Sequence, residues 1–253
     1  MRVQKERMWL GIAGLALLAA CGSTGTNGNG SPSDSASGAG GPEGASAVTA
    51  ENTPAAGNGT AAGGSTRRVV VLGTSLTAGL GLDPDDAYPA LLQAKADSAG
   101  LPVTIVNAGL SGETSAGALR RAAWVLEQPA ALVILEVGAN DGLRGVDPDS
   151  TYANLVQLVE TVRAQRPEAG IALVQMEAPS NLGRAYTRRF HEAYVRASKA
   201  TAVPLWPFLL DGVAGVARLN QADGIHPNPQ GSRRVAATMW TSMEPALRAL
   251  PSP

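Results

Sequence analysis

From residue 67 onward, short apolar runs alternate with longer segments in which apolar residues recur every three or four positions. The short runs are rich in valine, isoleucine and leucine, as expected for strands buried on both faces, whereas the periodic segments are typical of amphipathic helices. The predicted strands cover residues 69–72, 103–106, 131–137, 171–176 and 203–206. The predicted helices cover residues 88–99, 114–126, 152–165, 184–200 and 230–247. This alternation predicts an α/β fold, a three-layer α/β/α sandwich around a flavodoxin-like parallel sheet of five strands.

The start of the chain has a different pattern, which is typical of an export signal. Arg2, Lys5 and Arg7 precede an apolar stretch over residues 8–20, which is too short for a comfortable transmembrane helix. Cys21 directly follows two alanines, and this arrangement resembles the lipobox of bacterial lipoproteins. The resemblance implies cleavage just before Cys21 and attachment of acyl chains to it, which would anchor the protein stably in a membrane. The alternative is a plain signal peptide with an incidental cysteine.

Residues 22–66 are predicted to be a flexible tether, because glycine supplies 12 of these 45 positions and no lysine, arginine or aromatic residue is present. Such a segment buries too little apolar surface to offset the entropy of ordering it. We therefore expect a lipoprotein signal peptide over 1–20, a lipidated Cys21 with a disordered tether over 21–66, and one folded domain over 67–250. The expected location is the bacterial cell envelope, at the outer membrane facing the periplasm.

Composition narrows the classes of partner and cofactor. The net charge of the 253 residues is −1, which argues against nucleic acid as a partner. One cysteine cannot form a disulfide within the chain, and two histidines make a histidine-rich metal site improbable. We expect no metal, no cofactor and a monomer.

Polar and glycine-containing segments follow three predicted strands and precede the last predicted helix. They cover residues 73–75, 107–109, 138–141 and 223–227. Each segment alone is typical of a turn or a helix cap. Together they would meet at the carboxyl edge of a parallel sheet, where open α/β folds place their sites.

In these segments the chain resembles the SGNH hydrolases, also called GDSL esterases and lipases. That family is named for a serine, a glycine, an asparagine and a histidine in four separated blocks, and this chain has Ser75, Gly109, Asn140 and His226 in that order. The similarity runs from about residue 67 to the last helix, and is strongest to the bacterial multifunctional thioesterase, arylesterase and lysophospholipase branch. It implies a serine esterase for carboxylic esters or thioesters, including aryl esters, short or medium acyl esters and lysophospholipids.

The chemistry of ester hydrolysis assigns a role to each of these residues. Ser75 is the candidate nucleophile, and a serine hydroxyl needs a base such as His226 to remove its proton. Asp223 lies three residues before His226, a spacing that can bring its carboxylate to the imidazole. The backbone N–H groups of Ser75 and Gly109 and the side-chain amide of Asn140 would donate to the oxyanion. A glycine at 109 would let the substrate approach closely, because no Cβ is in the way.

Two residues depart from the family's usual pattern. Thr74 stands where the family usually has aspartate, and Ala139 where close relatives often have glycine. The usual aspartate is neither the base nor the carboxylate that orients it, and a threonine hydroxyl can make part of its local hydrogen bonds. We therefore predict that activity is retained.

The substrate pocket is the least specified part of the prediction. Leu110, Asn181, Leu182 and Tyr186 are candidates by position, and a loop equivalent to residues 179–186 closes over the acyl chain in the related thioesterases. Two other functions stay open. One is a carbohydrate O-deacetylase of the same family, which the 4% aromatic content disfavours. The other is a catalytically silent lipoprotein that binds acyl groups.

Overall fold

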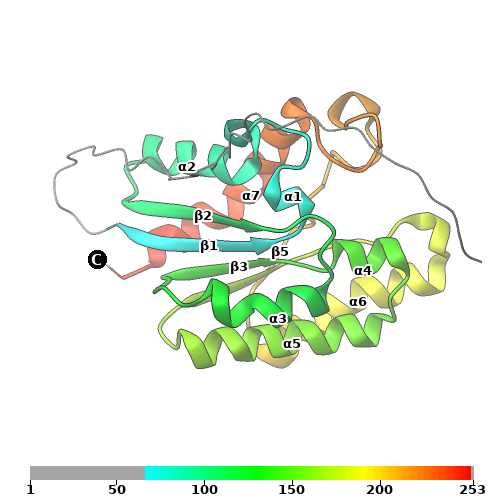
Figure 1. Ribbon diagram of the computed structural model, residues 1–253, viewed down its shortest axis with the longest axis horizontal. Coiled ribbons are helices and arrows are strands. Elements are labelled where there is room, and N and C mark those ends of the chain that lie inside the picture. The colour runs from blue at the N-terminus through cyan, green and yellow to red at the C-terminus, as the bar shows by residue number, and fades with distance from the viewer. Residues whose placement is uncertain (1–65, 252–253) are drawn as a thin grey trace, which may run out of the picture. The chain divides into compact units, whose positions relative to one another are not determined.

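Five parallel strands form the predicted sheet, in the order β2-β1-β3-β4-β5 (Figure 1). The computed structural model describes residues 66–251, so the predicted signal peptide, Cys21 and nearly all of the tether lie outside the described residues. The strands are β1 (Arg67–Gly73), β2 (Val103–Gly109), β3 (Leu132–Glu136), β4 (Gly170–Val174) and β5 (Leu205–Trp206). The α/β class and the five-stranded parallel sheet are confirmed.

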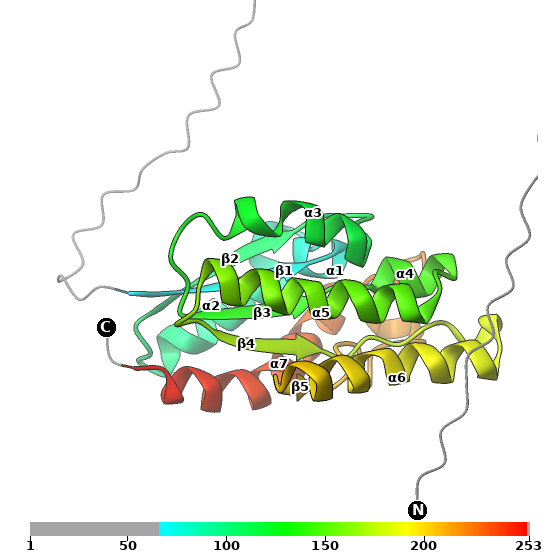
Figure 2. The same cartoon turned by 90° about the horizontal axis from the view of Figure 1, so that it is seen from below.

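Helices cover both faces of the sheet, which gives the three layers expected from the alternating pattern (Figures 1 and 2). Helices α2 (Tyr88–Ser98) and α7 (Pro229–Ala249) pack together on one face. Helices α3 (Ser115–Val125), α5 (Pro148–Gln165) and α6 (Arg184–Thr201) pack in a row on the other. None of the helices within residues 66–251 is long and apolar enough to cross a membrane.

The centre of the core is the apolar part of β1 and β3. The four residues 69–72 of β1 have no exposed surface, and all of β3 is buried. Each large aliphatic side chain buried in this way contributes about 1.5–3 kcal/mol relative to an exposed one. This burial from both faces explains why the two strands read as continuous hydrophobic runs rather than alternating ones.

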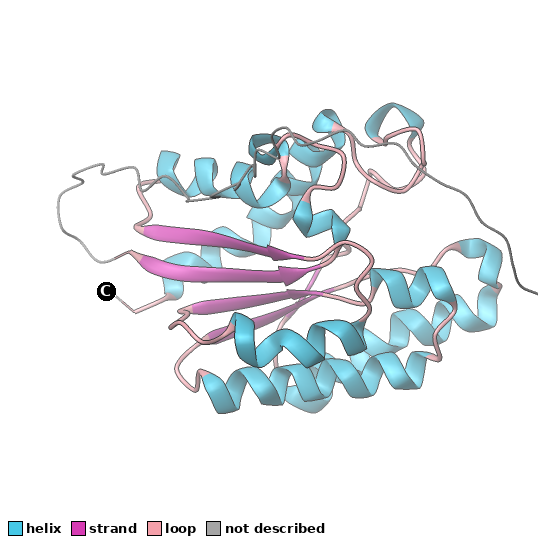
Figure 3. Ribbon diagram, viewed as in Figure 1, coloured by secondary structure: helices cyan, strands magenta, loops and turns pink. Residues whose placement is uncertain are grey.

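Short elements at the ends of the strands differ from the prediction (Figure 3). Two short helices were not predicted: α4 (Ala139–Arg144) follows β3, and the one-turn helix α1 (Ser75–Ala78) begins at the candidate nucleophile. Helix α5 begins four residues before the predicted start because Asp147 caps it and Pro148 fits its first turn. Three 3-10 turns, Pro84–Asp86, Ser180–Leu182 and Ala217–Leu219, lie in the connections.

The two ends of the folded domain lie side by side at the amino edge of the sheet. The guanidinium of Arg67, the first residue of β1, donates to the backbone oxygens of Leu250 and Pro251, each at 3.0 Å. The side chain at the start of the domain thus holds the segment that follows its last helix.

Candidate functional site

The three central strands end level with one another, and this alignment assembles the candidate site. Gly73 at the end of β1 stands opposite Gly109 of β2 on one side and Glu136 of β3 on the other. The chain then turns into α1 after β1 and into α4 after β3, so Ser75 and Asn140 enter the same edge. The predicted convergence at the carboxyl edge is therefore what the structure has.

Ser75 is the first residue of α1, and its neighbour Thr74 caps that helix. The hydroxyl of Thr74 accepts from the backbone N–H of Leu76 at 3.4 Å, and the helix ends at Gly79, whose φ is +74°. At the first position of a helix the N–H of Ser75 has no intrahelical acceptor, and no hydrogen-bond acceptor for it lies among residues 66–251. The turn thus presents both the hydroxyl and a free N–H of Ser75.

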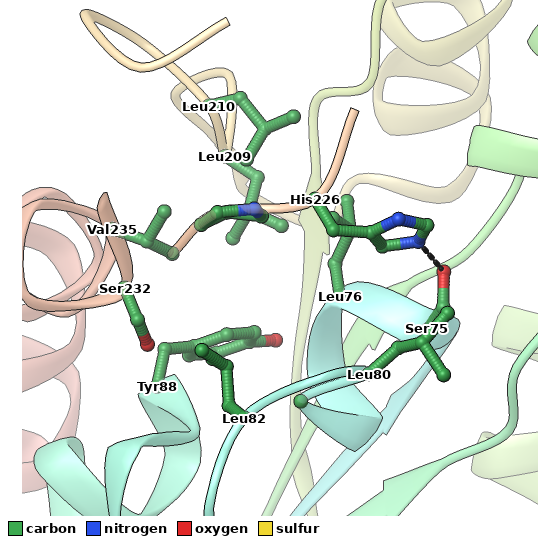
Figure 4. A pocket seen from close by; sticks show the side chains of 12 residues that line it. Ser75, Leu76, Leu80, Leu82, Tyr88, Leu209, Leu210, His226, Ser232 and Val235 are labelled. Carbon is green, nitrogen blue, oxygen red and sulfur yellow. Dashed lines mark hydrogen bonds between the residues drawn. The ribbon is translucent and has the colours of Figure 1, made fainter. Parts of the chain in front are cut away.

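His226 and Asp223 reach Ser75 from the loop before α7. His226 Nε2 lies 2.8 Å from Ser75 Oγ, and His226 Nδ1 lies 2.5 Å from Asp223 Oδ2 (Figure 4 shows the contact with Ser75). The second oxygen of Asp223 accepts the backbone N–H groups of Ile225 at 2.9 Å and His226 at 3.0 Å. One carboxylate oxygen therefore holds the loop, while the other holds the imidazole.

These hydrogen bonds keep Asp223 ionised. The pKa of its carboxyl is lowered to about 2, first by the hydrogen bond from His226 and then by the two backbone N–H groups. A charged carboxylate fixes the proton of the imidazole on Nδ1 and leaves Nε2 as an acceptor facing Ser75.

Asn140 and Gly109, the other two predicted donors, lie at the same edge but already have partners. Asn140 donates one of its two amide hydrogens to the backbone oxygen of Glu113 at 3.0 Å. The backbone N–H of Gly109 donates to Asn107 Oδ1 at 3.0 Å, and Asn107 is exposed. Asn140 keeps one amide hydrogen, whereas Gly109 would have to exchange its partner.

The structure gives a second reason for a glycine at 109, besides the predicted approach of the substrate. A Cβ at this position would lie 2.2 Å from the backbone nitrogen of Ala78 in α1, closer than real Cβ contacts allow. Gly109 therefore lets β2 pack directly against the helix that carries Ser75.

An apolar cavity of about 470 Å³ opens beside Ser75. Its wall combines apolar side chains from α1, α4, the segment after β4 and the loops before α7: Leu76, Ala139, Leu143, Met176, Ala178, Pro179, Phe208, Leu210 and Ile225. Asn140 also faces the cavity, and Ala139 supplies a methyl group to its wall. Within residues 66–251, no cluster of three or more metal-ligating side chains is present.

None of the four predicted substrate-contacting residues lines this cavity. Leu110 is half exposed and borders a separate hollow beside β2 and α3. Asn181 and Leu182 lie just beyond Pro179 and Ser180, which do line the cavity. The hydroxyl of Tyr186 donates to the backbone oxygen of Val146 at 2.8 Å, which ties α6 to the end of α4. Contact of these four residues with substrate stays a prediction.

A buried carboxyl behind Ser75 was missed in the sequence. Glu136 has no exposed surface and accepts the backbone N–H of Thr74 at 2.9 Å and the hydroxyls of Thr74 at 3.0 Å and Thr77 at 2.6 Å. The hydroxyl of Thr74 thus donates to Glu136 and caps α1. The signal available in the sequence was a glutamate closing a strand that is otherwise wholly apolar.

Glu136 is expected to make the stability of the protein depend on pH. Burial, the largest cause, raises the pKa of its carboxyl to about 7 from 4.5. A raised folded-state pKa means that this group's contribution to stability is full below pH 4.5 and is lost as the pH rises through 7. The difference in the free energy of unfolding between wild type and Glu136→Gln isolates this contribution. Wild type is expected to lose about 2–3 kcal/mol relative to the variant between pH 5 and pH 8. Urea titrations at the two pH values measure this difference.

The exposed Glu127→Gln is the matched control for that measurement, since Glu127 lies on the surface after α3. Its difference from wild type is expected to stay constant between pH 5 and pH 8. If the difference in unfolding free energy between wild type and Glu136→Gln is also independent of pH, Glu136 does not titrate between pH 5 and pH 8.

Comparison with known proteins agrees with this geometry. The model of the GDSL-like Lipase/Acylhydrolase family matches residues 71–234. The chain is 38% identical over 180 residues to Esterase TesA of Pseudomonas aeruginosa, covering 71% of this chain and 89% of that protein. It is 37% identical to Thioesterase 1/protease 1/lysophospholipase L1 of Escherichia coli, covering 71% of this chain and 84% of that one.

Solved structures of relatives share the fold. The crystal structure of the psychrotrophic esterase EstA from Pseudoalteromonas sp. superposes with a TM-score of 0.68 at 35% identity, covering 72% of this chain and 99% of that chain. Sequence, structure and the arrangement of the four blocks agree, and the chain belongs to the GDSL-like lipase/acylhydrolase family, the SGNH hydrolases, as a carboxylic ester hydrolase.

Proposed function

We propose that this protein is a serine esterase that cleaves carboxylic esters or thioesters through an acyl-enzyme on Ser75. The observation that carries the proposal is the hydrogen-bonded series from Asp223 through His226 to Ser75, with 2.5 Å and 2.8 Å between the joined atoms. Nucleophile, base and orienting carboxylate are within the reach that proton transfer requires.

The reaction then proceeds in two halves. Ser75 Oγ attacks the carbonyl carbon while its proton passes to His226 Nε2, and Asp223 stabilises the imidazolium that forms. The tetrahedral intermediate collapses, the alcohol or thiol leaves with the proton from His226, and the acyl group stays on Ser75. Water attacks the acyl-enzyme with His226 again as base, and the acid is released with Ser75 restored.

Three donors would stabilise the oxyanion of each tetrahedral intermediate. The N–H of Ser75 has no acceptor among residues 66–251, and Asn140 keeps one free amide hydrogen. For Gly109 we propose that the oxyanion displaces the exposed side chain of Asn107 from the N–H group. A charged oxyanion is a stronger acceptor than an amide oxygen, so this exchange is favourable.

The apolar wall of the cavity supports an acyl chain as the group bound beside Ser75. Phe208 is the only aromatic side chain among its lining residues, which disfavours a sugar stacked in the cavity. Aryl esters, short or medium acyl esters, thioesters and lysophospholipids are the proposed substrates. Relatives named arylesterase and thioesterase/lysophospholipase support this range.

A fluorophosphonate probe tests the proposal directly. The probe is expected to label Ser75, as located by peptide mass spectrometry, and to abolish hydrolysis of p-nitrophenyl esters. Rates of hydrolysis of p-nitrophenyl esters with acyl chains from acetyl to decanoyl, of a lysophospholipid and of acetyl-xylan would show which substrate the enzyme prefers. Absence of both labelling and ester hydrolysis would exclude a serine esterase and favour a silent acyl-binding protein.

We also propose that the protein is a lipoprotein of the bacterial envelope, anchored through Cys21. The support is the sequence alone: a basic start, a short apolar stretch and the chain's single cysteine directly after Ala19 and Ala20. Growth with an alkyne fatty acid should label the full chain and leave Cys21→Ser unlabelled. Equal labelling of both would contradict the proposal.

A further inference from the structure

The three proposed oxyanion donors belong to three separate segments of the chain. Ser75 begins α1, Gly109 ends β2, and Asn140 lies in α4 after β3. An oxyanion hole depends on holding its donors within about 0.5 Å of their places, because a displaced donor stabilises the transition state less. The groups that hold these three segments in place therefore bear on catalysis.

One guanidinium contacts the backbone of two of these segments. Arg121, on α3, donates from Nη2 to the backbone oxygen of Ala108 at 2.9 Å and to that of Gly73 at 3.2 Å. Gly73 lies two residues before Ser75, and Ala108 directly precedes Gly109. Figure 1 shows α3 lying along the sheet, with its first turn near the edge where β1 and β2 end.

The bond to Ala108 acts on the peptide unit that contains the Gly109 N–H. In a trans peptide the C=O and the N–H point in opposite directions, so fixing the oxygen of Ala108 on Arg121 directs the N–H of Gly109 away from α3. A cation on the oxygen also polarises the peptide and makes its N–H a stronger donor. Arg121 thus affects both the direction and the strength of this donor.

The Gly73–Thr74 peptide unit, one before the unit that carries the Ser75 N–H, is held at both ends. Its oxygen, on Gly73, accepts from Arg121 and also from the backbone N–H of Leu110 at 2.9 Å. Its N–H, on Thr74, donates to buried Glu136. The turn that presents Ser75 therefore has a guanidinium on one side and a buried carboxyl on the other.

Glu113 fixes Arg121 and also reaches the third donor. Its carboxylate accepts from Arg121 Nε at 2.7 Å and Nη2 at 2.6 Å, and its side chain is only 5% exposed. The backbone oxygen of Glu113 accepts the side-chain amide of Asn140 at 3.0 Å. Gly117 leaves room for this carboxylate, since a Cβ there would lie 2.8 Å from Glu113 Cγ.

We propose that Arg121, held by Glu113, is a positioning residue that aligns the oxyanion donors of Ser75, Gly109 and Asn140. The proposal rests on the serine esterase mechanism given above. Arg121 does not touch the substrate. It acts directly on the peptide unit that carries the Gly109 N–H, on the Gly73–Thr74 unit that leads into Ser75, and through Glu113 on Asn140.

Arg121→Lys is the discriminating variant, because lysine keeps the charge but lacks the planar fork that bonds Glu113 and both carbonyls at once. With p-nitrophenyl butyrate we expect kcat to fall roughly 10- to 100-fold while KM changes less than about threefold. The inhibition constant of phenylboronic acid, which forms a tetrahedral adduct on the serine, should rise by the same factor as kcat falls.

Arg166→Lys is the matched control. Arg166 also donates to backbone oxygens, those of Glu127, Gln128 and Gln165, but it lies before β4, at the amino edge of the sheet. The activities of both variants are compared at a temperature below their unfolding midpoints, which are measured by circular dichroism. If Arg121→Lys does not fold, Glu113→Gln, which keeps both arginine–carbonyl bonds but weakens their anchor, takes its place with the same expectations.

The outcomes separate this proposal from the mechanism on which it rests. If Ser75→Ala is inactive and the position-121 variant has the kcat and boronate affinity of the control, the positioning role is refuted and the esterase mechanism stands. If Ser75→Ala keeps full activity, the mechanism itself is refuted. A variant at position 121 in which only KM rises, while kcat and the affinity for the boronate stay unchanged, also refutes the positioning role.

Discussion

A Ser75→Ala enzyme is expected to hydrolyse p-nitrophenyl butyrate roughly 10⁴- to 10⁶-fold more slowly than the wild type. The change removes the only atom proposed to attack the ester, and what remains is the rate enhancement due to binding and oxyanion stabilisation. The fold should be unaffected, because His226 is the one partner of the Ser75 hydroxyl within residues 66–251 and the backbone of α1 is held by Thr74 and Glu136. Steady-state kinetics and thermal unfolding of the same preparation measure the two effects.

Ser98→Ala is the control for that experiment, since Ser98 is exposed on α2 and its hydroxyl donates to the backbone oxygen of Ala94. It should keep wild-type kcat. Hydrolysis by Ser75→Ala within tenfold of wild type would show that another group is the nucleophile. Retention of fatty-acid binding in the inactive variant would show that the cavity binds acyl groups independently of the chemistry.

Asp223→Asn is expected to lower kcat roughly 10³- to 10⁴-fold. An asparagine can keep Oδ1 on the N–H groups of Ile225 and His226, so the loop is retained. Its amide nitrogen would then replace Oδ2 opposite His226 Nδ1, where it favours the tautomer with the proton on Nε2 and removes the acceptor that Ser75 needs. Measurements of kcat/KM from pH 4 to pH 9 would show the loss.

The pH dependence of kcat/KM in the wild type is the reference for Asp223→Asn. Because the pKa of Asp223 is lowered to about 2, its charge does not change between pH 4 and pH 9, and any limb of the wild-type profile must come from another group. Asp97→Asn, on the exposed side of α2, is the matched control. If Asp223→Asn matched that control at every pH, Asp223 would have no part in orienting the imidazole.

The large-scale fold and the four blocks could be predicted because each depends on local pattern. The strands read as apolar runs because both faces of the sheet are covered, and Asp223 and His226 lie within one short loop. The interactions of Glu136 and Arg121 could not be predicted, because they depend on how strand ends and α3 meet in space. The pocket prediction depended on loop conformation: Leu110 follows β2 directly, yet it faces a hollow separate from the cavity beside Ser75.

The hydrogen bonds from Arg67 to the backbone oxygens of Leu250 and Pro251 hold the first and last residues of the folded domain together. Entry and exit of the chain lie together, at the edge of the sheet opposite Ser75. Domains with adjacent ends tolerate insertion into a host loop and circular permutation. Immobilised on a support by either end, the domain would keep Ser75 on the side away from the support.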